Sequence, residues 1–219
     1  MNSSQPSLFN KTSATFPLDR LQSPTTLRRT TLNKTEIRDL RRSQTAAEAL
    51  SGFGQGVEIY GFTKGQFSLV NIIEAALEIT GPANLTVSTW AAAKTSISTI
   101  LGLVKSGKLT DSKWLIDLTL QRRLPELTKS IRDTFGSDSI RVGANHAKWF
   151  MLQNADWNIV CITSMNLNHN PRFENFMIRT DRAMCEFHST IIGEIWKNQK
   201  PSLASQSPAQ INQHFRETM

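Results

Sequence analysis

The sequence contains little cysteine, little histidine and no long apolar run. Cysteine occurs twice in 219 residues, at Cys161 and Cys185, and both lie within apolar segments. This usage predicts small buried side chains in a reducing compartment and excludes a disulfide framework, so we expect a cytoplasmic protein. No apolar run approaches the roughly 18 residues that cross a bilayer, which excludes a membrane span. Residues 1–16 lack the apolar core of a secretory signal.

The chain is long enough for one domain with a sizeable core. Residues 1–32 mix Ser, Thr, Asn and Pro without a hydrophobic period, which predicts a disordered or extended arm. Residues 33–55 are expected to form an N-terminal helix and a Gly-rich link, and residues 56–198 the main domain. Residues 199–219 are rich in Pro, Ser and Gln and are expected to form a flexible tail.

The predicted N-terminal helix begins at Asn33, and Glu36 completes a capping-box-like start. Its outer face carries Arg38, Arg41 and Arg42. These arginines are either a solvated face or a phosphate-binding arm. The net charge of +7 is compatible with a polyanionic partner without identifying one.

From residue 57 onward, short apolar runs alternate with segments of helical period. The predicted strands are residues 57–62, 84–90, 113–120, 140–152, 158–166 and 174–181. The predicted helices are residues 68–80, 94–107, 124–136 and 182–198. The alternation predicts an α/β fold in which a mixed β-sheet is flanked by helices on both faces.

Polar side chains gather at one end of a predicted hairpin. Side chains in a strand alternate between faces, so His146 and Lys148 share one face, and Ser164 and Asn166 share a face of the returning strand. A turn centred on Asp156 would pair Lys148 with Ser164 and His146 with Asn166. A register shifted by an odd number of residues would separate them.

These groups suit attack on a phosphate. A neutral imidazole can attack phosphorus while lysine and asparagine hold the non-bridging oxygens, and a second, protonated imidazole is needed for the leaving oxygen. We expect no metal ion and no cofactor, because His146, Asp156, Cys161 and His169 show none of the close paired spacings of zinc sites.

The run "HAKWFML…IVCITSMNLN…FEN" resembles the phospholipase D superfamily. In that family a His-x-Lys strand precedes a turn and a second strand that ends in Gly-Ser-x-Asn. A Glu-Asn pair then opens a further strand. The resemblance covers roughly residues 56–198 and implies a phospholipase D-like fold.

Carried over residue by residue, the resemblance implies a role for each motif residue. His146 is implied as the nucleophile, and Lys148 and Asn166 as phosphate ligands. Ser164 is implied as a supporting hydroxyl that binds substrate. Glu174 is implied as a carboxylate that orients or tunes an active-site histidine.

The chain departs from the family pattern at two positions. The family has an aspartate where this chain has Gln153, and Asp156 lies three residues further on, in a position to support the site indirectly. Thr163 replaces the family's glycine and adds bulk near the phosphate, where we expect it to contact substrate. Arg172 lies close enough in the sequence to touch substrate as well.

Only one motif is present, since His169, His188 and His214 are not followed by lysine two residues later. His169 is interpreted as a loop residue. The chemistry needs two histidines, so the resemblance implies one half-site per chain and a homodimer with both His146 side chains facing across a two-fold axis.

Other prominent side chains have less specific interpretations. We interpret Trp149, Trp157 and Phe173 as hairpin packing and not as base-stacking platforms. Arg122 and Arg123 are either ligand contacts at a strand end or a solvated pair.

Single-motif members of the superfamily tend to be nucleases, and lipid-acting members usually carry two motifs. The resemblance and the positive charge together favour a metal-independent phosphodiesterase that acts on DNA or RNA as a nuclease through a phosphohistidine. The alternative is a catalytically silent DNA- or RNA-binding module with the same fold. A third possibility is a phospholipid hydrolase.

Overall fold

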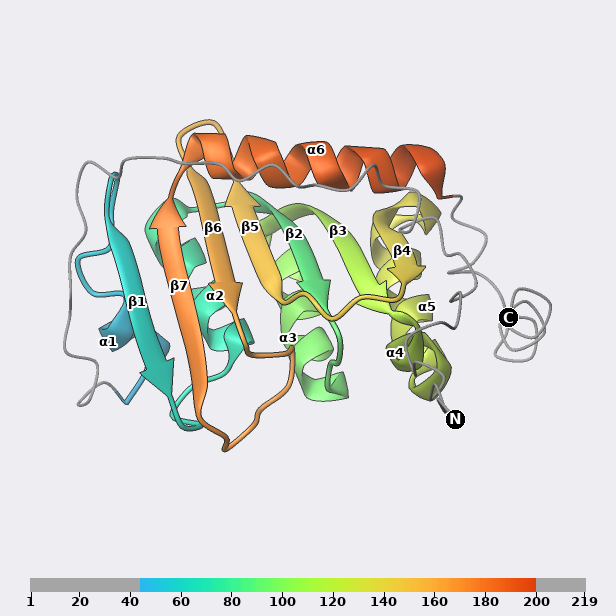
Figure 1. The fold of residues 1–219 in the computed structure, drawn as a ribbon, viewed down its shortest axis with the longest axis horizontal. Coiled ribbons are helices and arrows are strands. Elements are labelled where there is room, and N and C mark those ends of the chain that lie inside the picture. The colour runs from blue at the N-terminus through green and yellow to red at the C-terminus, as the bar shows by residue number, and fades with distance from the viewer. Residues whose placement is uncertain (1–43, 200–219) are drawn as a thin grey trace, which may run out of the picture.

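The computed structural model describes residues 44–199, which contain a seven-stranded mixed sheet (Figure 1). The strands are β1 Glu58–Thr63, β2 Ala83–Thr89, β3 Leu109–Asp117, β4 Ile140–Gly143, β5 Trp149–Gln153, β6 Asn158–Thr163 and β7 Glu174–Thr180. Their order across the sheet is β1-β7-β6-β5-β2-β3-β4. The helices are α1 Ala46–Ala49, α2 Leu69–Thr80, α3 Lys94–Lys105, α4 Leu118–Arg123, α5 Pro125–Phe135 and α6 Arg182–Asn198, with a 3₁₀ turn at Ser137–Ser139.

Strand direction brings distant segments to one edge of the sheet. β3 runs parallel to β2, and β5 runs antiparallel to both β2 and β6. The same edge therefore carries the last residues of β2, β3 and β6 (Thr89, Asp117 and Thr163) and the first residues of β5 and β7 (Trp149 and Glu174). We refer to this as the carboxyl edge.

Local sequence explains where α2 begins and ends. Ser68 and Asn71 form a reciprocal capping box, with the Asn71 N–H 3.3 Å from Ser68 Oγ and the Ser68 N–H 3.0 Å from Asn71 Oδ1. Gly81 ends the helix with a φ of 70°, a conformation that suits glycine. The predicted helix 68–80 is thus confirmed almost to the residue.

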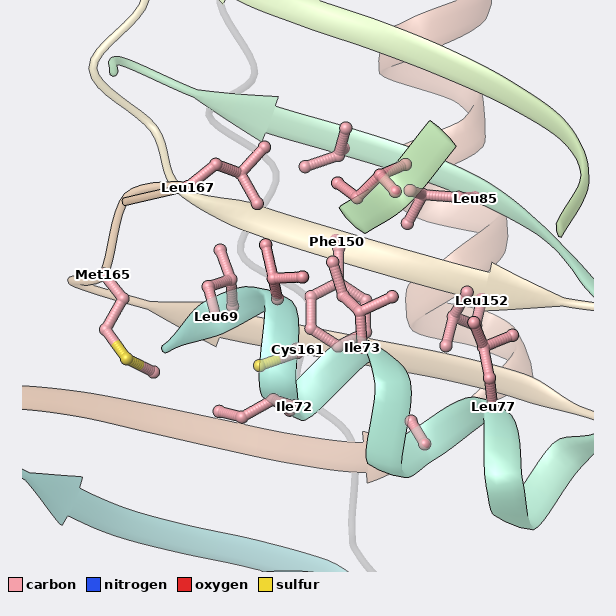
Figure 2. Packing of buried hydrophobic residues seen from close by; sticks show 14 of the residues in the cluster. Leu69, Ile72, Ile73, Leu77, Leu85, Phe150, Leu152, Cys161, Met165 and Leu167 are labelled. Carbon is pink, nitrogen blue, oxygen red and sulfur yellow. The ribbon is translucent and has the colours of Figure 1, made fainter. Parts of the chain in front are cut away.

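The main core lies between the sheet and α2. Figure 2 shows Leu69, Ile73 and Leu77 of α2 packed against Phe150, Cys161 and their buried neighbours in the sheet. The opposite face of the sheet is partly covered by α6 (Figure 1), against which Met151 and Val160 pack through Cys185. The expected mixed sheet with helices on both faces is confirmed.

Both cysteines are fully buried, as expected from their apolar surroundings. Burial raises the pKa of the Cys161 thiol and raises that of Cys185 to about 12. Neither thiol therefore forms a reactive thiolate near neutral pH.

Three predicted strands differ from the observed ones. The predicted strand 158–166 ends at Thr163, so Ser164 and Asn166 lie in the loop that follows β6. Residues 113–120 do not form one strand, because Asp117 accepts a hydrogen bond from the Thr119 N–H and caps α4. Residues 140–152 form two strands, β4 and β5, that lie three places apart in the sheet. Residues 144–148 cross between them, past the ends of β3 and β2 (Figure 1).

The predicted hairpin register is also wrong. Phe150 pairs with Cys161 and Trp149 with Ile162, so the register is odd and Lys148 does not pair with Ser164. The cause is the turn, in which the Asn154 N–H donates to the Trp157 carbonyl and closes a four-residue loop.

Other predictions concern residues outside the described part of the chain. The arm 1–32, the first part of the predicted helix with its three arginines, and the tail from residue 200 lie there. Within residues 44–199, none of the helices is both long and apolar enough to span a membrane.

Candidate active site

The segment that carries His146 is anchored by the residue before it. Asn145 is buried, and its side-chain amide nitrogen lies 3.0 Å from Ser88 Oγ, 3.1 Å from the Leu115 carbonyl and 3.3 Å from the Thr89 carbonyl. Its backbone N–H donates to Asp117 Oδ2 at 3.0 Å. Asn145 therefore fixes the crossing segment to the ends of β2 and β3.

His146 is exposed at this edge, and its ring lies 5.3 Å from the Trp90 ring, centroid to centroid. Lys148 Nζ lies 3.1 Å from Nδ1 and 3.3 Å from Nε2 of the same imidazole, and it donates to the His146 carbonyl at 2.6 Å. The imidazole and the ammonium group therefore lie side by side at an accessible point of the carboxyl edge.

Burial and the neighbouring carboxylates shift the pKa of Lys148 in opposite directions. Partial burial lowers the pKa of Lys148, and the carboxylates of Glu174 and Asp117 raise it in part. The ammonium group thus lies within the field of two carboxylates on the carboxyl edge.

Ser164 and Glu174 form a second polar pair on this edge. The Ser164 hydroxyl donates to Glu174 Oε2 and accepts from the Asn175 N–H at 3.0 Å. The amide of Asn170 lies 3.4 Å from the other Glu174 oxygen. The structure therefore holds this carboxylate through two side chains from the loop between β6 and β7.

Asn166 links this loop to the end of β2. Its Oδ1 accepts a hydrogen bond from the Ala91 N–H at 3.1 Å and lies 3.5 Å from Thr89 Oγ1. Since Asn145 also binds Thr89, the segments that carry His146 and Asn166 meet at the same residue. The side-chain amide nitrogen of Asn166 is the group that could bind a phosphate oxygen.

Thr163 and Arg172 have different positions. Thr163 is buried, and its hydroxyl donates to the Asn175 carbonyl at 2.6 Å and accepts from the Met165 N–H at 3.0 Å. The Thr163 hydroxyl thus supports the backbone around it, and the expected substrate contact through Thr163 stays a prediction. Arg172 is exposed in the loop before β7, on the side of the carboxyl edge.

Asp156 requires a correction. It lies in the β5–β6 turn, at the far end of the hairpin, about 17 Å along the five-residue strand β5 from the carboxyl edge. Its backbone N–H bonds to Asn154 and its carbonyl to Gln55. Gln153 lies at the same end and donates to Asn158. The contacts of Asp156 are all at this far end, so none of them provides the expected indirect support to the site.

Three groups near His146 were not identified from the sequence: Trp90, Asp117 and Asn145. Asp117 ends an apolar strand that is parallel to its neighbour, a position where ligand-binding groups often occur in α/β sheets. Asn145 carried no signal of its own, because its role depends on the crossing of residues 144–148 over β2. Within the described residues, no cluster of three His, Cys, Asp or Glu side chains could hold a metal ion.

Comparisons with known proteins give a fold likeness only. No family model and no curated protein matches the chain. The similar solved structures include polyphosphate kinase from Porphyromonas gingivalis (13% identity, TM-score 0.48, 66% of this chain and 26% of that one). They also include a phospholipase D family member, Nuc from Salmonella typhimurium (13% identity, TM-score 0.45, 65% of this chain and 95% of that one). A third is phosphatidylserine synthase from Haemophilus influenzae (15% identity, TM-score 0.48, 73% of this chain and 44% of that one).

The chain spans about a quarter of the polyphosphate kinase and under half of the synthase. Nuc is described as a member of the family that the His146 motif resembles. Because all three TM-scores lie below 0.5, these likenesses carry no argument about activity.

Proposed function

We propose that this protein is a phosphodiesterase that cleaves nucleic acid through a phosphohistidine intermediate, without a metal ion. The observation that carries the proposal is the exposed His146 imidazole with the Lys148 ammonium group 3.1 Å from its Nδ1. An accessible nucleophile and a fixed positive charge are the two elements that attack on a phosphodiester requires.

In the proposed first step, a ring nitrogen of His146 forms a bond to phosphorus and the phosphorus–oxygen bond to the leaving group breaks. Lys148 and the side-chain amide of Asn166 bind the non-bridging oxygens, whose negative charge increases as the bond forms. The leaving oxygen takes a proton from a second imidazole. In the second step, water attacks phosphorus, the nitrogen–phosphorus bond breaks, and the second imidazole takes the proton from water.

The second imidazole is proposed to be His146 of a second copy of the chain. Two other histidines are described, and neither is placed for the role: His188 is buried against Trp149, and His169 Nε2 lies 3.1 Å from the Gly65 carbonyl. A two-fold axis near His146 would bring two identical half-sites together.

Positive charge supports nucleic acid as the substrate. The whole chain carries a net charge of +7, and the exposed Lys64 and Arg172 flank the carboxyl edge on the β1 side. Polyanionic strands bind such surfaces through their phosphates, with an affinity that falls as salt rises.

The test is cleavage of single- and double-stranded DNA and RNA in excess EDTA, with wild type and His146→Ala in parallel. We expect cleavage that survives EDTA and falls by at least about a thousandfold in His146→Ala, because the variant removes both nucleophile and acid. His169→Ala serves as the matched control, as an exposed histidine outside the motif.

The other outcomes identify the alternatives. Salt-sensitive binding without cleavage, unchanged in His146→Ala, would identify a silent DNA- or RNA-binding module. Hydrolysis of a phospholipid, with no action on nucleic acid, would identify a lipid enzyme. Cleavage that stops in EDTA would contradict the proposed mechanism.

A further inference from the structure

Three exposed aromatic side chains lie together beside the candidate active site. Tyr60, Phe62 and Phe173 are 52%, 46% and 70% exposed, and we call them the aromatic patch. The Phe62 and Phe173 rings are stacked, 4.9 Å apart at an interplanar angle of 13°, and the Tyr60 ring meets Phe62 edge-on at 5.2 Å. The outer face of Phe173 is thus available to a further ring.

The patch is exposed because the neighbouring helix does not reach it. Tyr60 and Phe62 alternate with the buried Ile59 and Gly61 along β1, so their side chains lie on the face of the sheet opposite α2. α6 covers part of this face, but it starts after β7 ends and crosses near the end of the strands away from the carboxyl edge (Figure 1).

The patch is continuous with the Ser164–Glu174 pair. Phe62 lies opposite Asn175 in the β1–β7 register, and the Asn175 N–H binds Ser164 Oγ at 3.0 Å. Phe173 directly precedes Glu174. β1 is three places from β5 in the sheet, so the patch lies about 15 Å from the strand that follows His146, within reach of a strand of a few nucleotides.

The surrounding charges favour a polyanion with aromatic bases. Lys64 follows Phe62 by two residues, Arg172 precedes Phe173, and both are exposed. The nearby carboxylate of Glu174 is already bound by Ser164 and Asn170. Cations that flank exposed rings are typical of surfaces that bind single-stranded nucleic acid, where bases stack on the rings and phosphates meet the cations.

A second copy of the chain fits this surface less well. A two-fold interface centred on the patch would bring Lys64 and Arg172 close to their own copies, and like charges at such a distance repel. A nucleic acid strand satisfies both the rings and the cations.

We propose that the aromatic patch stacks against an unpaired base of a single-stranded nucleic acid whose phosphodiester lies at His146. The inference rests on the proposed function and makes it more specific. Bases in a duplex are paired and stacked and do not present a free face, so the site prefers single strands.

The experiment measures binding in the His146→Ala background, where cleavage is expected to be too slow to consume the probe. The DNA probes are a fluorescent single-stranded oligonucleotide, the same strand with abasic residues, and a duplex. The intact single strand is also tested as RNA. We expect Phe173→Leu to weaken binding of the intact strand about tenfold and to leave abasic and duplex binding within about twofold, because leucine keeps apolar area but has no ring. Phe173→Trp should restore binding.

Equal binding of the intact strand by Phe173→Leu and its parent would overturn the inference. So would a variant that loses its dimer on a sizing column and keeps its preference for the intact over the abasic strand, since the patch would then be an interface. Base-dependent binding by a wild-type chain that cuts no nucleic acid would overturn the proposed function and leave the stacking site in place.

Discussion

At the scale of single residues, the geometry around His146 depends on one buried amide. Asn145 directly precedes His146 and bonds to the backbone of β2 and β3 and to the Ser88 hydroxyl. Its own Oδ1 accepts from the Ala147 N–H at 3.2 Å, so Asn145 holds the segment on both sides of His146. Asn145 therefore positions the segment that carries the imidazole. Asp117 in turn holds Asn145 by accepting a hydrogen bond from its backbone N–H.

Replacement of Asn145 by alanine should therefore cost both stability and activity. Asn145→Ala removes the buried side-chain donor to Ser88 Oγ and to the carbonyls of Thr89 and Leu115, and we expect the free energy of unfolding to fall by about 3 kcal/mol. Urea unfolding followed by circular dichroism measures the change. Asn84→Ala is the matched control, because Asn84 is exposed and its bond to Thr110 should contribute about 1 kcal/mol or less. Equal losses in the two variants would contradict the anchoring role.

A second residue-scale prediction concerns pH. Partial burial lowers the pKa of Lys148 below its usual 10.5, so its ammonium group loses the proton at a lower pH than a free lysine does. Phosphate binding needs the charged form, and activity should fall as the pH rises through this lowered pKa. Glu174→Gln removes a charge that raises the pKa of Lys148, so the alkaline limb of the normalised rate profile should move to lower pH.

The control for that profile is Glu194→Gln, which removes an exposed carboxylate on α6. Its alkaline limb should coincide with that of the wild type. An alkaline limb that stays in place in Glu174→Gln would show that Lys148 does not determine it.

At the scale of helices and strands, elements with local signals could be predicted from the sequence. The capping box at Ser68 and the glycine after residue 80 define α2 without any knowledge of the sheet. The division of residues 140–152 could not be predicted, because its apolar pattern reads as one strand and only the sheet order separates the two halves. The hairpin register was also mispredicted, because the turn spans residues 154–157 and is therefore not centred on Asp156 as expected.

The same distinction between local and long-range signals explains which residues of the candidate site could be identified from the sequence. His146, Lys148, Ser164 and Glu174 were identified because they form a motif in sequence, and the structure places each of them on the carboxyl edge. Asn145 and Asp117 contribute through contacts made across the sheet, which no local pattern encodes. Phe173 was interpreted as packing, but it is largely exposed, because α6 leaves that part of the sheet uncovered.

One prediction at this scale concerns the edge strand β1. Arg179 of β7 binds Glu58 of β1 at 3.1 Å and Asp181 at 3.1 Å, and all three side chains are nearly buried. Arg179→Ala leaves two buried carboxylates unpaired, so we expect a loss of about 3–5 kcal/mol in the free energy of unfolding. Arg182→Ala breaks only the exposed pair with Glu186 and should change it by about 0.5 kcal/mol or less. Denaturant titrations of both variants measure the two losses in the free energy of unfolding. Similar unfolding midpoints for Arg179→Ala and Arg182→Ala would contradict the stabilising role of the buried ion pairs.

At the scale of the whole molecule, the proposed site is incomplete in one chain. Within residues 44–199, a single chain offers one accessible imidazole next to a lysine, and the proposed chemistry uses two. A shared site has a consequence that a complete site in each chain does not have: one defective subunit inactivates its partner. The activity of mixed populations is therefore more informative than the size of the particle alone.

Wild type and His146→Ala, unfolded together in equal amounts and refolded, should combine at random. If each site needs two His146 side chains, only the wild-type pairs are active, and the mixture should retain about a quarter of the activity of the same total amount of wild type. Independent sites would retain about half. Lys105→Ala, an exposed change at the end of α3, is the refolding control and should leave the activity of its mixture undiminished. Retention of half would place both proton transfers within one chain and would require an acid other than the second His146.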